Sequence, residues 1–410
     1  MSEQKVTKGH LGKGTEAEWY QPQDLSAEKR EEFRKRSQKS QLAALAARRG
    51  DGPKSIHPLY EPRFDPATVM PRKRRNGLRA LSLFSGGGGL DLGFDLAGFK
   101  HIASYELLEF AAATLKKNRP RWAVYGGDEG DVTEVDWTKY RGEIDVIHGG
   151  PPCQPFSSAG RRKGSDDARD MFPEFVRAVL EIEPAGFIAE NVRGLDTKKF
   201  EPYINKTIRE PLEEKYSIIS FHLDAAAFGV PQKRTRVVFI GLHREKVGRK
   251  PAIPEPTHDW SRFDKSNKVP EEQLDLIDSP KLPATMGARE ALGLPDIGID
   301  ALSPTLRCSL TGPRGTTSIL SSTAAQKIWF DLELWPNGVA ANKEAAKAFP
   351  AKHDYYRLST LECGLMQGFP EDWVFEGAVH KVLGQIGNSV APPMAYGLAT
   401  SLAKDILGSG

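Results

Sequence analysis

Cysteine is scarce in this 410-residue chain, and the three cysteines, Cys153, Cys308 and Cys363, lie far apart. Because no Cys-x-x-Cys or mixed Cys/His spacing occurs, the sequence predicts neither a disulfide framework nor a metal site. The chain also lacks any apolar run near the roughly 18 residues of a membrane span, and no apolar stretch follows its charged first residues. We therefore expect a soluble, cytoplasmic protein with no membrane partner.

Net charge is also small, at +3. It is unevenly distributed, because residues 1–75 contain 17 Lys and Arg against 10 Asp and Glu, whereas the remainder contains 40 against 44. Any broad attraction for a polyanion is therefore expected to be concentrated in the N-terminal part of the chain.

The N-terminal part is predicted to contain one charged helix and a linker. Ser26 is a suitable N-cap, and helix formers continue through Arg49 to a stop at Gly50. Few apolar residues could pack, which favours a solvated or loosely docked helix. The alternative is a basic strap on nucleic-acid phosphates, helped by the basic run at 72–75. We treat residues 1–76 as a basic extension that ends in a Pro-rich linker.

A strand pattern over residues 78–84 leads into Ser85 and four glycines, followed by an amphipathic helix that stops at Gly98. This order allows backbone to approach a nucleotide closely, although glycine runs are often simple turns and nicotinamide enzymes use the same device. No Gly-Lys-Ser/Thr follows, which excludes a P-loop. The next strand ends in Glu106, where nucleotide folds place a ribose-binding carboxylate; an exposed strand-end glutamate is the alternative.

Residues 144–157 contain the strongest catalytic signal. An apolar strand pattern ends in two glycines and two prolines, and Cys153 follows at once. A cysteine at the carboxyl end of a strand lies where open α/β sheets bind ligands, although most lone cysteines are small buried hydrophobes. The polar stretch 158–170 is expected to form a mobile lid.

Three further charged residues are candidates for the same site. Glu190 directly follows a strand pattern, and it could meet Cys153 in space or be merely structural. Arg234 and Arg236 enter an apolar strand on one face, which is costly unless they meet an anion or a hydrogen-bond acceptor.

Alternating strand and helix patterns predict a doubly wound α/β sheet. We expect a catalytic domain at 77–243 and a small, loop-rich β domain at 244–350, where proline becomes frequent. Residues 351–410 are expected to return to the catalytic domain, with residues 386–393 opening a C-terminal helix that has Met394, Leu398, Leu402 and Ile406 along one face.

Several segments occur in an order that resembles the motif series of the DNA cytosine carbon-5 methyltransferases. They span about four-fifths of the chain. The segments are Phe84-Ser-Gly-Gly-Gly-Gly89, Pro151-Pro-Cys-Gln154, Glu190-Asn-Val192, Gln232-Lys-Arg-Thr-Arg236, Arg357 to Trp373, and Gly387-Asn-Ser-Val390. The resemblance implies a Rossmann-like class I methyltransferase sheet with a smaller target-recognition domain.

The resemblance also implies residue roles. Cys153 would add to carbon-6 of cytosine, Glu190 would act at ring nitrogen 3, and Arg234 and Arg236 would bind the exocyclic oxygen and a phosphate. The methyl donor would be S-adenosylmethionine. Its implied neighbours are Phe84, Gly86, Gly88, Gly89, Glu106, Asp131, Val132, Pro152, Asn388 and Ser389. The implied DNA contacts are Gln154, Ser157, Arg161, Arg162, Gln232, Arg307, Arg314, Thr316 and Thr317.

The expected partner is double-stranded DNA, in which the target base flips out of the helix. We expect a protein that acts as a monomer, with a cognate restriction endonuclease that shares its site without needing to bind. The alternatives are methylation of transfer RNA, a nicotinamide oxidoreductase and a catalytically inactive DNA-binding regulator.

Overall fold

The computed structural model describes residues 26–152, 170–264, 282–307 and 317–408. Within these residues the large lobe is built on a seven-stranded sheet of order β3-β2-β1-β4-β5-β7-β6. β7 runs antiparallel to β5 and β6, and the other pairings are parallel. The strands are β1 Arg79–Leu83, β2 Lys100–Glu106, β3 Val124–Gly126, β4 Val146–Gly149, β5 Gly186–Val192, β6 Tyr216–Asp224 and β7 Thr235–His243.

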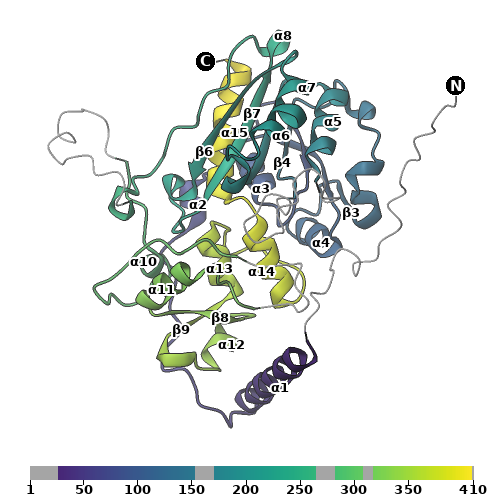
Figure 1. Ribbon diagram of the computed structural model, residues 1–410. Helices are drawn as coiled ribbons and strands as arrows, with labels where there is room; N and C mark the ends of the chain where they lie inside the picture. The colour runs from purple at the N-terminus through teal and green to yellow at the C-terminus, as the bar shows by residue number, and fades with distance from the viewer. Residues whose placement is uncertain (1–25, 153–169, 265–281, 308–316, 409–410) are drawn as a thin grey trace.

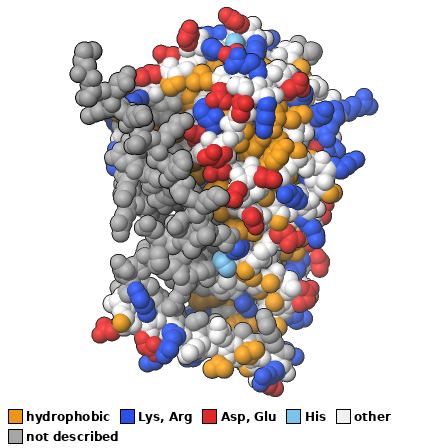
Figure 2. Space-filling model, turned by 90° about the vertical axis from the view of Figure 1, so that its right-hand side faces the viewer, with side chains coloured by type: hydrophobic (Ala, Val, Ile, Leu, Met, Phe, Trp, Pro, Cys, Tyr) orange, Lys and Arg blue, Asp and Glu red, His pale blue; other side chains and the backbone are white. Residues whose placement is uncertain are grey.

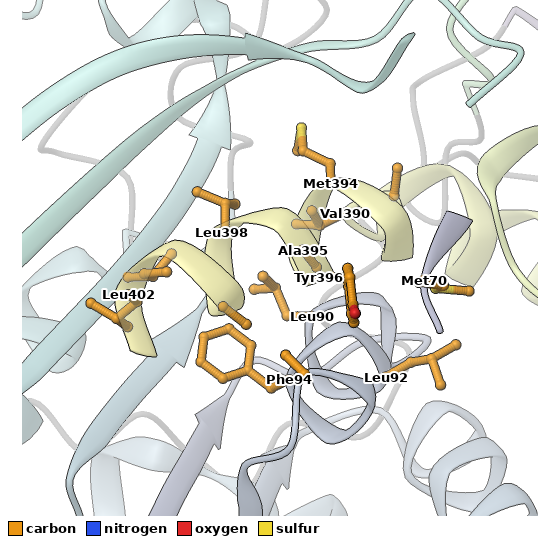
Figure 3. Packing of buried hydrophobic residues seen from close by; sticks show 14 of the residues in the cluster. Met70, Leu90, Leu92, Phe94, Val390, Met394, Ala395, Tyr396, Leu398 and Leu402 are labelled. Atoms are coloured by element: carbon orange, nitrogen blue, oxygen red, sulfur yellow. The ribbon is translucent and has the colours of Figure 1, made fainter. Parts of the chain in front are cut away.

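Helices cover both faces of this sheet (Figure 1). They are α3 Gly89–Leu96, α4 Glu109–Asn118, α5 Phe172–Ile182, α6 Glu201–Ile204, α7 Glu210–Leu212, α8 Arg244–Val247 and α15 Pro392–Leu407. Successive side chains of a strand point to opposite faces, so Val146 of β4 packs with α3 and α15 while Ile147 packs with α5. Figure 3 shows the first of these layers, in which α3, with Leu90 and Phe94, packs against the side of α15 that contains Ala395 and Tyr396. The predicted α/β class and Rossmann-like sheet are confirmed.

The smaller lobe differs from the expected β domain. Among the described residues it has two strands, which pair in parallel, and its remaining elements are helices. These elements are α10 Ala288–Ala291, α11 Thr323–Asp331, β8 Leu334–Ala340, α12 Lys343–Lys347, β9 Tyr356–Ser359, α13 Thr360–Gln367 and α14 Val379–Asn388.

The core of the small lobe includes residues on both sides of position 351. Trp329 and Leu334 share one hydrophobic cluster with Tyr356, Met366 and Ile386. β9, α13 and α14 therefore pack with the small lobe, whereas Phe369 and Trp373, between α13 and α14, belong to the large-lobe cluster.

The expectation for the C-terminal helix needs a related correction. Asn388 is the last residue of α14, and α15 begins at Pro392 with proline in its first turn. Proline is favoured there because the first helical N–H groups have no partner in the helix. The predicted opening segment, residues 386–393, thus contains the end of α14 as well as the first turn of α15, and the predicted C-terminal helix is present.

The predicted N-terminal helix is present as α1 Ala27–Arg49. The expected linker is an ordered strap over residues 51–77 that includes the short helix α2 Pro66–Val69. Its Phe64 N–H donates to Ala291 O at 3.0 Å in the small lobe, and Met70 is buried in the large-lobe core. None of the described helices is long and apolar enough to span a membrane.

The basic run at 72–75 lies away from the carboxyl edge of the sheet. Arg72 and Arg75 form ion pairs with Asp95 at 3.0 and 3.1 Å. Asp95 lies near the end of α3, which starts at the glycine turn and runs back toward the opposite edge. These two guanidinium groups therefore have a structural partner within the fold.

Candidate active site

The glycine turn after β1 begins with a residue that has an unusual backbone conformation. Phe84 has φ 56°, a left-handed conformation that costs a residue with a side chain about 1–2 kcal/mol. Gly86 also has a positive φ, and a Cβ placed there would meet no atom of the described residues within 4 Å. The space above Gly86 is therefore open to a ligand that approaches the backbone.

The other glycines of the turn have a different explanation. A Cβ on Gly88 would lie 2.8 Å from the Trp373 ring, and one on Gly89 would lie 2.0 Å from Val390 O. Trp373 Nε1 also donates to Gly87 O at 3.1 Å. Their small size is thus required by packing against the C-terminal segment, whereas the sequence interpretation assigned Gly88 and Gly89 to cofactor contact.

Glu106 lies at the end of β2 beside this turn. Its Oε2 accepts from Gly86 N at 2.6 Å, and its Oε1 accepts from Leu108 N at 2.8 Å. Burial raises the pKa of Glu106, and these two backbone hydrogen bonds oppose that effect. The carboxylate fixes the turn and keeps further lone pairs for hydroxyl groups of a ligand.

The turn after β3 contains Asp131 and Val132, two of the predicted neighbours of the methyl donor. Asp131 Oδ1 accepts from Thr133 N at 3.0 Å and from Thr133 Oγ1 at 2.8 Å. Val132 is buried in the core cluster that contains Tyr105 and Trp137. One oxygen of Asp131 is therefore engaged in shaping the turn, and Val132 contributes mainly to packing.

The start of the nucleophile loop is attached to β5. Asn191 Nδ2 donates to Pro151 O at 3.1 Å, and Pro151 is buried while Pro152 is half-buried. Glu190 Oε2 would lie 3.1 Å from a Cβ on Gly150, so this oxygen faces the loop three residues before Cys153. The predicted residues Cys153, Gln154, Ser157, Arg161 and Arg162 lie outside the described residues, as does the expected lid.

Glu190 and Arg236 form a buried ion pair. Strand register places Arg236 opposite Val192, so Arg236 and Glu190 are diagonal neighbours on one face of the sheet. Arg236 Nε lies 2.8 Å from Glu190 Oε1, and both side chains are about one-tenth exposed. Burial raises the pKa of Glu190, while Arg236 and Arg234 lower it, and burial has the larger effect. One carboxylate oxygen is therefore held by Arg236 and the other faces the loop.

Arg234 joins this edge of the sheet to the C-terminal segment. It is fully buried, and its Nη2 donates to Gly387 O at 2.8 Å and Ser389 O at 2.6 Å. Ser389 Oγ in turn donates to Gln385 O at 2.8 Å, and the Asn388 side chain is exposed. In this arrangement Arg234 positions residues 387–389 behind the glycine turn.

Gln232 was predicted to contact DNA, and the structure contradicts this expectation. Its side chain is fully buried between the lobes. Its Nε2 donates to Met366 O at 3.2 Å and to Gln367 Oε1 at 2.9 Å, and the Ser303 N–H donates to Pro231 O beside it. Gln232 therefore joins the two lobes.

The predicted DNA contacts of the small lobe are only partly described. Arg307 is exposed and Thr317 is half-buried. Between them lies the stretch 308–316, which contains Arg314 and Thr316 and is outside the described residues. Arg307 N–H donates to Ile319 O at 3.4 Å, which keeps the two flanks of that stretch adjacent.

Sequence reasoning did not assign separate roles to Asn191 and Trp373, although both lie in the recognised motifs. Asn191 adjoins Glu190, so its polarity inside a buried strand was the available signal. The contact of Trp373 with the glycine turn joins segments 286 residues apart, and no local pattern predicts it.

Comparison with known proteins matches this geometry. The model of the C-5 cytosine-specific DNA methylase family matches residues 78–291 and 312–404. The Type II methyltransferase M.NgoMIV of Neisseria gonorrhoeae is 33% identical over 330 residues, which cover 79% of this chain and 97% of that protein. M.Eco47II of Escherichia coli is 32% identical over 353 residues, covering 80% and 79%.

Among solved structures, a Spodoptera frugiperda DNMT2 variant has a TM-score of 0.48 and 16% sequence identity, covering 81% of this chain and 100% of that one. The family match spans most of the chain and includes each segment that forms the described edge of the sheet. The chain therefore belongs to the C-5 cytosine-specific DNA methylase family and is a DNA cytosine-5-methyltransferase.

Proposed function

We propose that the protein methylates carbon-5 of a flipped-out cytosine in a short double-stranded DNA sequence through a covalent adduct with Cys153. The observation that carries the proposal is the buried Glu190, whose Oε1 is held by Arg236 while Oε2 faces the loop before Cys153. This places an acid, its positioning cation and the nucleophile loop at one edge of the sheet.

The chemistry follows from the low nucleophilicity of cytosine carbon-5. Formation of a bond between the Cys153 sulfur and carbon-6 pushes an electron pair toward ring nitrogen 3. A protonated Glu190 stabilises this nitrogen by donating a hydrogen bond or a proton to it. Carbon-5 would then form a bond to the methyl group of the donor as the bond between that methyl and the donor's sulfur breaks, which would leave that sulfur as a neutral thioether. Loss of the carbon-5 proton to a base expels the thiolate and restores the aromatic ring.

Burial supplies the condition that Glu190 needs. Because burial raises its pKa, the protonated carboxyl is more available near neutral pH than that of an exposed glutamate. Arg236 keeps the carboxyl in a fixed orientation through Oε1. Arg236 is a positioning residue in this respect, and its charge also favours the thiolate.

The family implies a methyl donor, and we propose S-adenosylmethionine, which supplies an electrophilic methyl group when bound. The open space over Gly86 and the adjacent Glu106 carboxylate fit a nucleoside with two ribose hydroxyls. Asp131, the backbone at Val132, Pro152, and Asn388 with Ser389 would border the same ligand. Phe84 would border it from the end of β1.

The target cytosine must leave the duplex, because carbon-6 of a stacked base cannot reach a loop at the sheet edge. We propose that the small lobe reads the recognition sequence with Arg307, Thr317 and the segment between them. Methylation of a short sequence would protect host DNA in a restriction-modification system, with a nuclease that acts on the same site and no requirement for a complex.

The first test is bisulfite sequencing of DNA from a host that expresses the chain, which would show one methylated sequence context. A duplex with 5-fluorocytosine at the identified position should then trap the protein covalently, because fluorine prevents loss of the carbon-5 substituent. Cys153→Ser should bind S-adenosylmethionine within a few fold of wild type and form no adduct. The matched control is Cys363→Ser in the small-lobe core, which should still be trapped.

Glu190→Gln separates the acid from the shape of the side chain. We expect it to lower kcat by about 10²–10⁴-fold while DNA affinity changes little. Methyl transfer by Cys153→Ser at the wild-type rate would contradict the proposal.

A further inference from the structure

The helix α1 is a strongly basic element that the proposed chemistry does not use. Residues 33–49 include six Lys and Arg and no Asp or Glu, and the acidic residues of the helix are confined to its first six positions. Lys35 is three-quarters exposed, and Lys39 and Arg49 are also exposed. Arg34 and Lys35 form ion pairs with Glu31 at 2.9 and 4.0 Å, so the excess positive charge of the helix lies in the part that follows, where Lys39 and Arg49 are exposed to solvent.

The strap keeps α1 close to the small lobe. Ser55 N–H donates to Lys347 O of α12 at 3.2 Å, and His57 Nε2 lies 2.6 Å from Asp354 O. Only the five residues 50–54 separate α1 from the first of these anchors, a span of at most about 20 Å. The helix is thus tethered beside the lobe that reads DNA (Figure 1).

Length and charge fit the outside of a duplex. A helix of 23 residues is about 35 Å long at 1.5 Å per residue, which corresponds to about ten base pairs of B-DNA. The chain after residue 75 has more acidic than basic residues, and Figure 2 shows both signs interspersed over the face that it displays. A long-range attraction for phosphates therefore depends mainly on the N-terminal part.

We propose that α1 binds the phosphate backbone of DNA flanking the recognition sequence and acts as a sequence-independent clamp. The partner is the same duplex that occupies the active site. Each cation that contacts a phosphate releases a condensed counterion, so the clamp adds affinity that salt removes. The inference concerns DNA affinity and is independent of the covalent step.

The helix also carries exposed Leu42 and Leu45, at 67% and 46% exposure. A protein partner that covers these two leucines is the competing interpretation. The positive charge of the helix and the DNA substrate of the family favour the duplex.

The test uses the full chain and fluorescence anisotropy with non-cognate duplexes of about 16 and about 40 base pairs, since only the longer one extends under the helix. The variant combines Lys35→Gln, Lys39→Gln and Arg49→Gln, which keep helix propensity and remove three charges. We expect at least tenfold weaker binding to the long duplex and a log K against log salt slope that is shallower by up to about 3. Binding to the short duplex should change by less than about threefold.

The control variant combines Leu42→Ser and Leu45→Ser, and we expect wild-type affinity and salt slope. Unchanged long-duplex binding in the charge variant would overturn the proposal, as would an equal loss on both duplexes. A loss of DNA affinity confined to the leucine variant would assign the helix to an apolar contact instead. Thermal unfolding of both variants should match wild type, because these side chains are exposed.

Discussion

Gly89→Ala offers a sharp test of the idea that the glycine turn is shaped by the C-terminal segment. Gly89 is the first residue of α3, where an alanine suits the helix. A Cβ at this position would lie 2.0 Å from Val390 O and 3.2 Å from Ser389 Cβ. Because the first of these atoms belongs to the backbone, α3 and residues 389–390 must separate by about 1 Å.

The magnitude follows from two opposing effects. Overpacking a dense core costs about 1–3 kcal/mol, and the obstacle here is backbone, which favours the upper part of that range. Alanine recovers about 1 kcal/mol of helix propensity relative to glycine. We expect a net loss of about 2 kcal/mol in the free energy of unfolding, which for a chain of this size lowers Tm by about 3 °C.

Gly86→Ala is the matched control, because a Cβ there meets no atom within 4 Å in the part of the chain that the structure describes. Its φ of 53° makes alanine cost about 1 kcal/mol, without displacement of a neighbour. If the nucleoside lies over Gly86, this variant should bind S-adenosylmethionine at least tenfold more weakly.

The assays are denaturant unfolding and isothermal titration with S-adenosylmethionine on both variants. Gly89→Ala with wild-type stability would refute the packing argument. Gly86→Ala with wild-type cofactor affinity would refute the placement of the ligand over the turn.

Two further predictions concern buried polar groups. Burial raises the pKa of Asp91 to about 6 from an ordinary 3.8, although Ser104 Oγ donates to it at 2.8 Å. The ionised form is thus disfavoured in the fold, so this group's stabilisation is complete below about pH 4 and is lost as pH rises through 6. Asp91→Asn should be up to about 3 kcal/mol more stable than wild type at pH 8 and equal to it near pH 4, as measured by urea unfolding. If the variant and wild type show the same dependence of stability on pH, the raised pKa of Asp91 is wrong. Gln232→Leu removes the hydrogen bonds to Met366 and Gln367 and should lower the free energy of unfolding by about 1–3 kcal/mol. If the variant instead loses DNA affinity at unchanged stability, the original prediction of a DNA contact is correct.

Much of the large lobe could be predicted from local patterns. The strand signals at residues 78–84 and 102–106 match β1 and β2 within about two residues. Apolar runs bounded by glycine and proline are strong signals, because those residues stop regular structure wherever they occur. Parallel order then brought the ends of β1, β4 and β5 to one edge, where the candidate residues were expected.

The predictions were wrong where one local sequence pattern is compatible with two different structural environments. Gln232 lies in a polar stretch that looks exposed, yet the small lobe covers it completely. The sequence around Gly387 and Asn388 carries signals that occur at either end of a helix, and the packing of α14 determines which one applies.

By itself the sequence determined the α/β class, the order of the motifs and the residue types available for covalent methyl transfer, because these depend on spacing and local chemistry. Only the tertiary structure decided that Glu190 forms an ion pair with Arg236 through one carboxylate oxygen. It also decided that position 89 must be glycine because Val390 packs against it, and that Arg72 pairs with Asp95. Each of these contacts joins atoms brought together by the sheet and its covering helices, and residues that meet across a packed core leave no periodic trace along the chain.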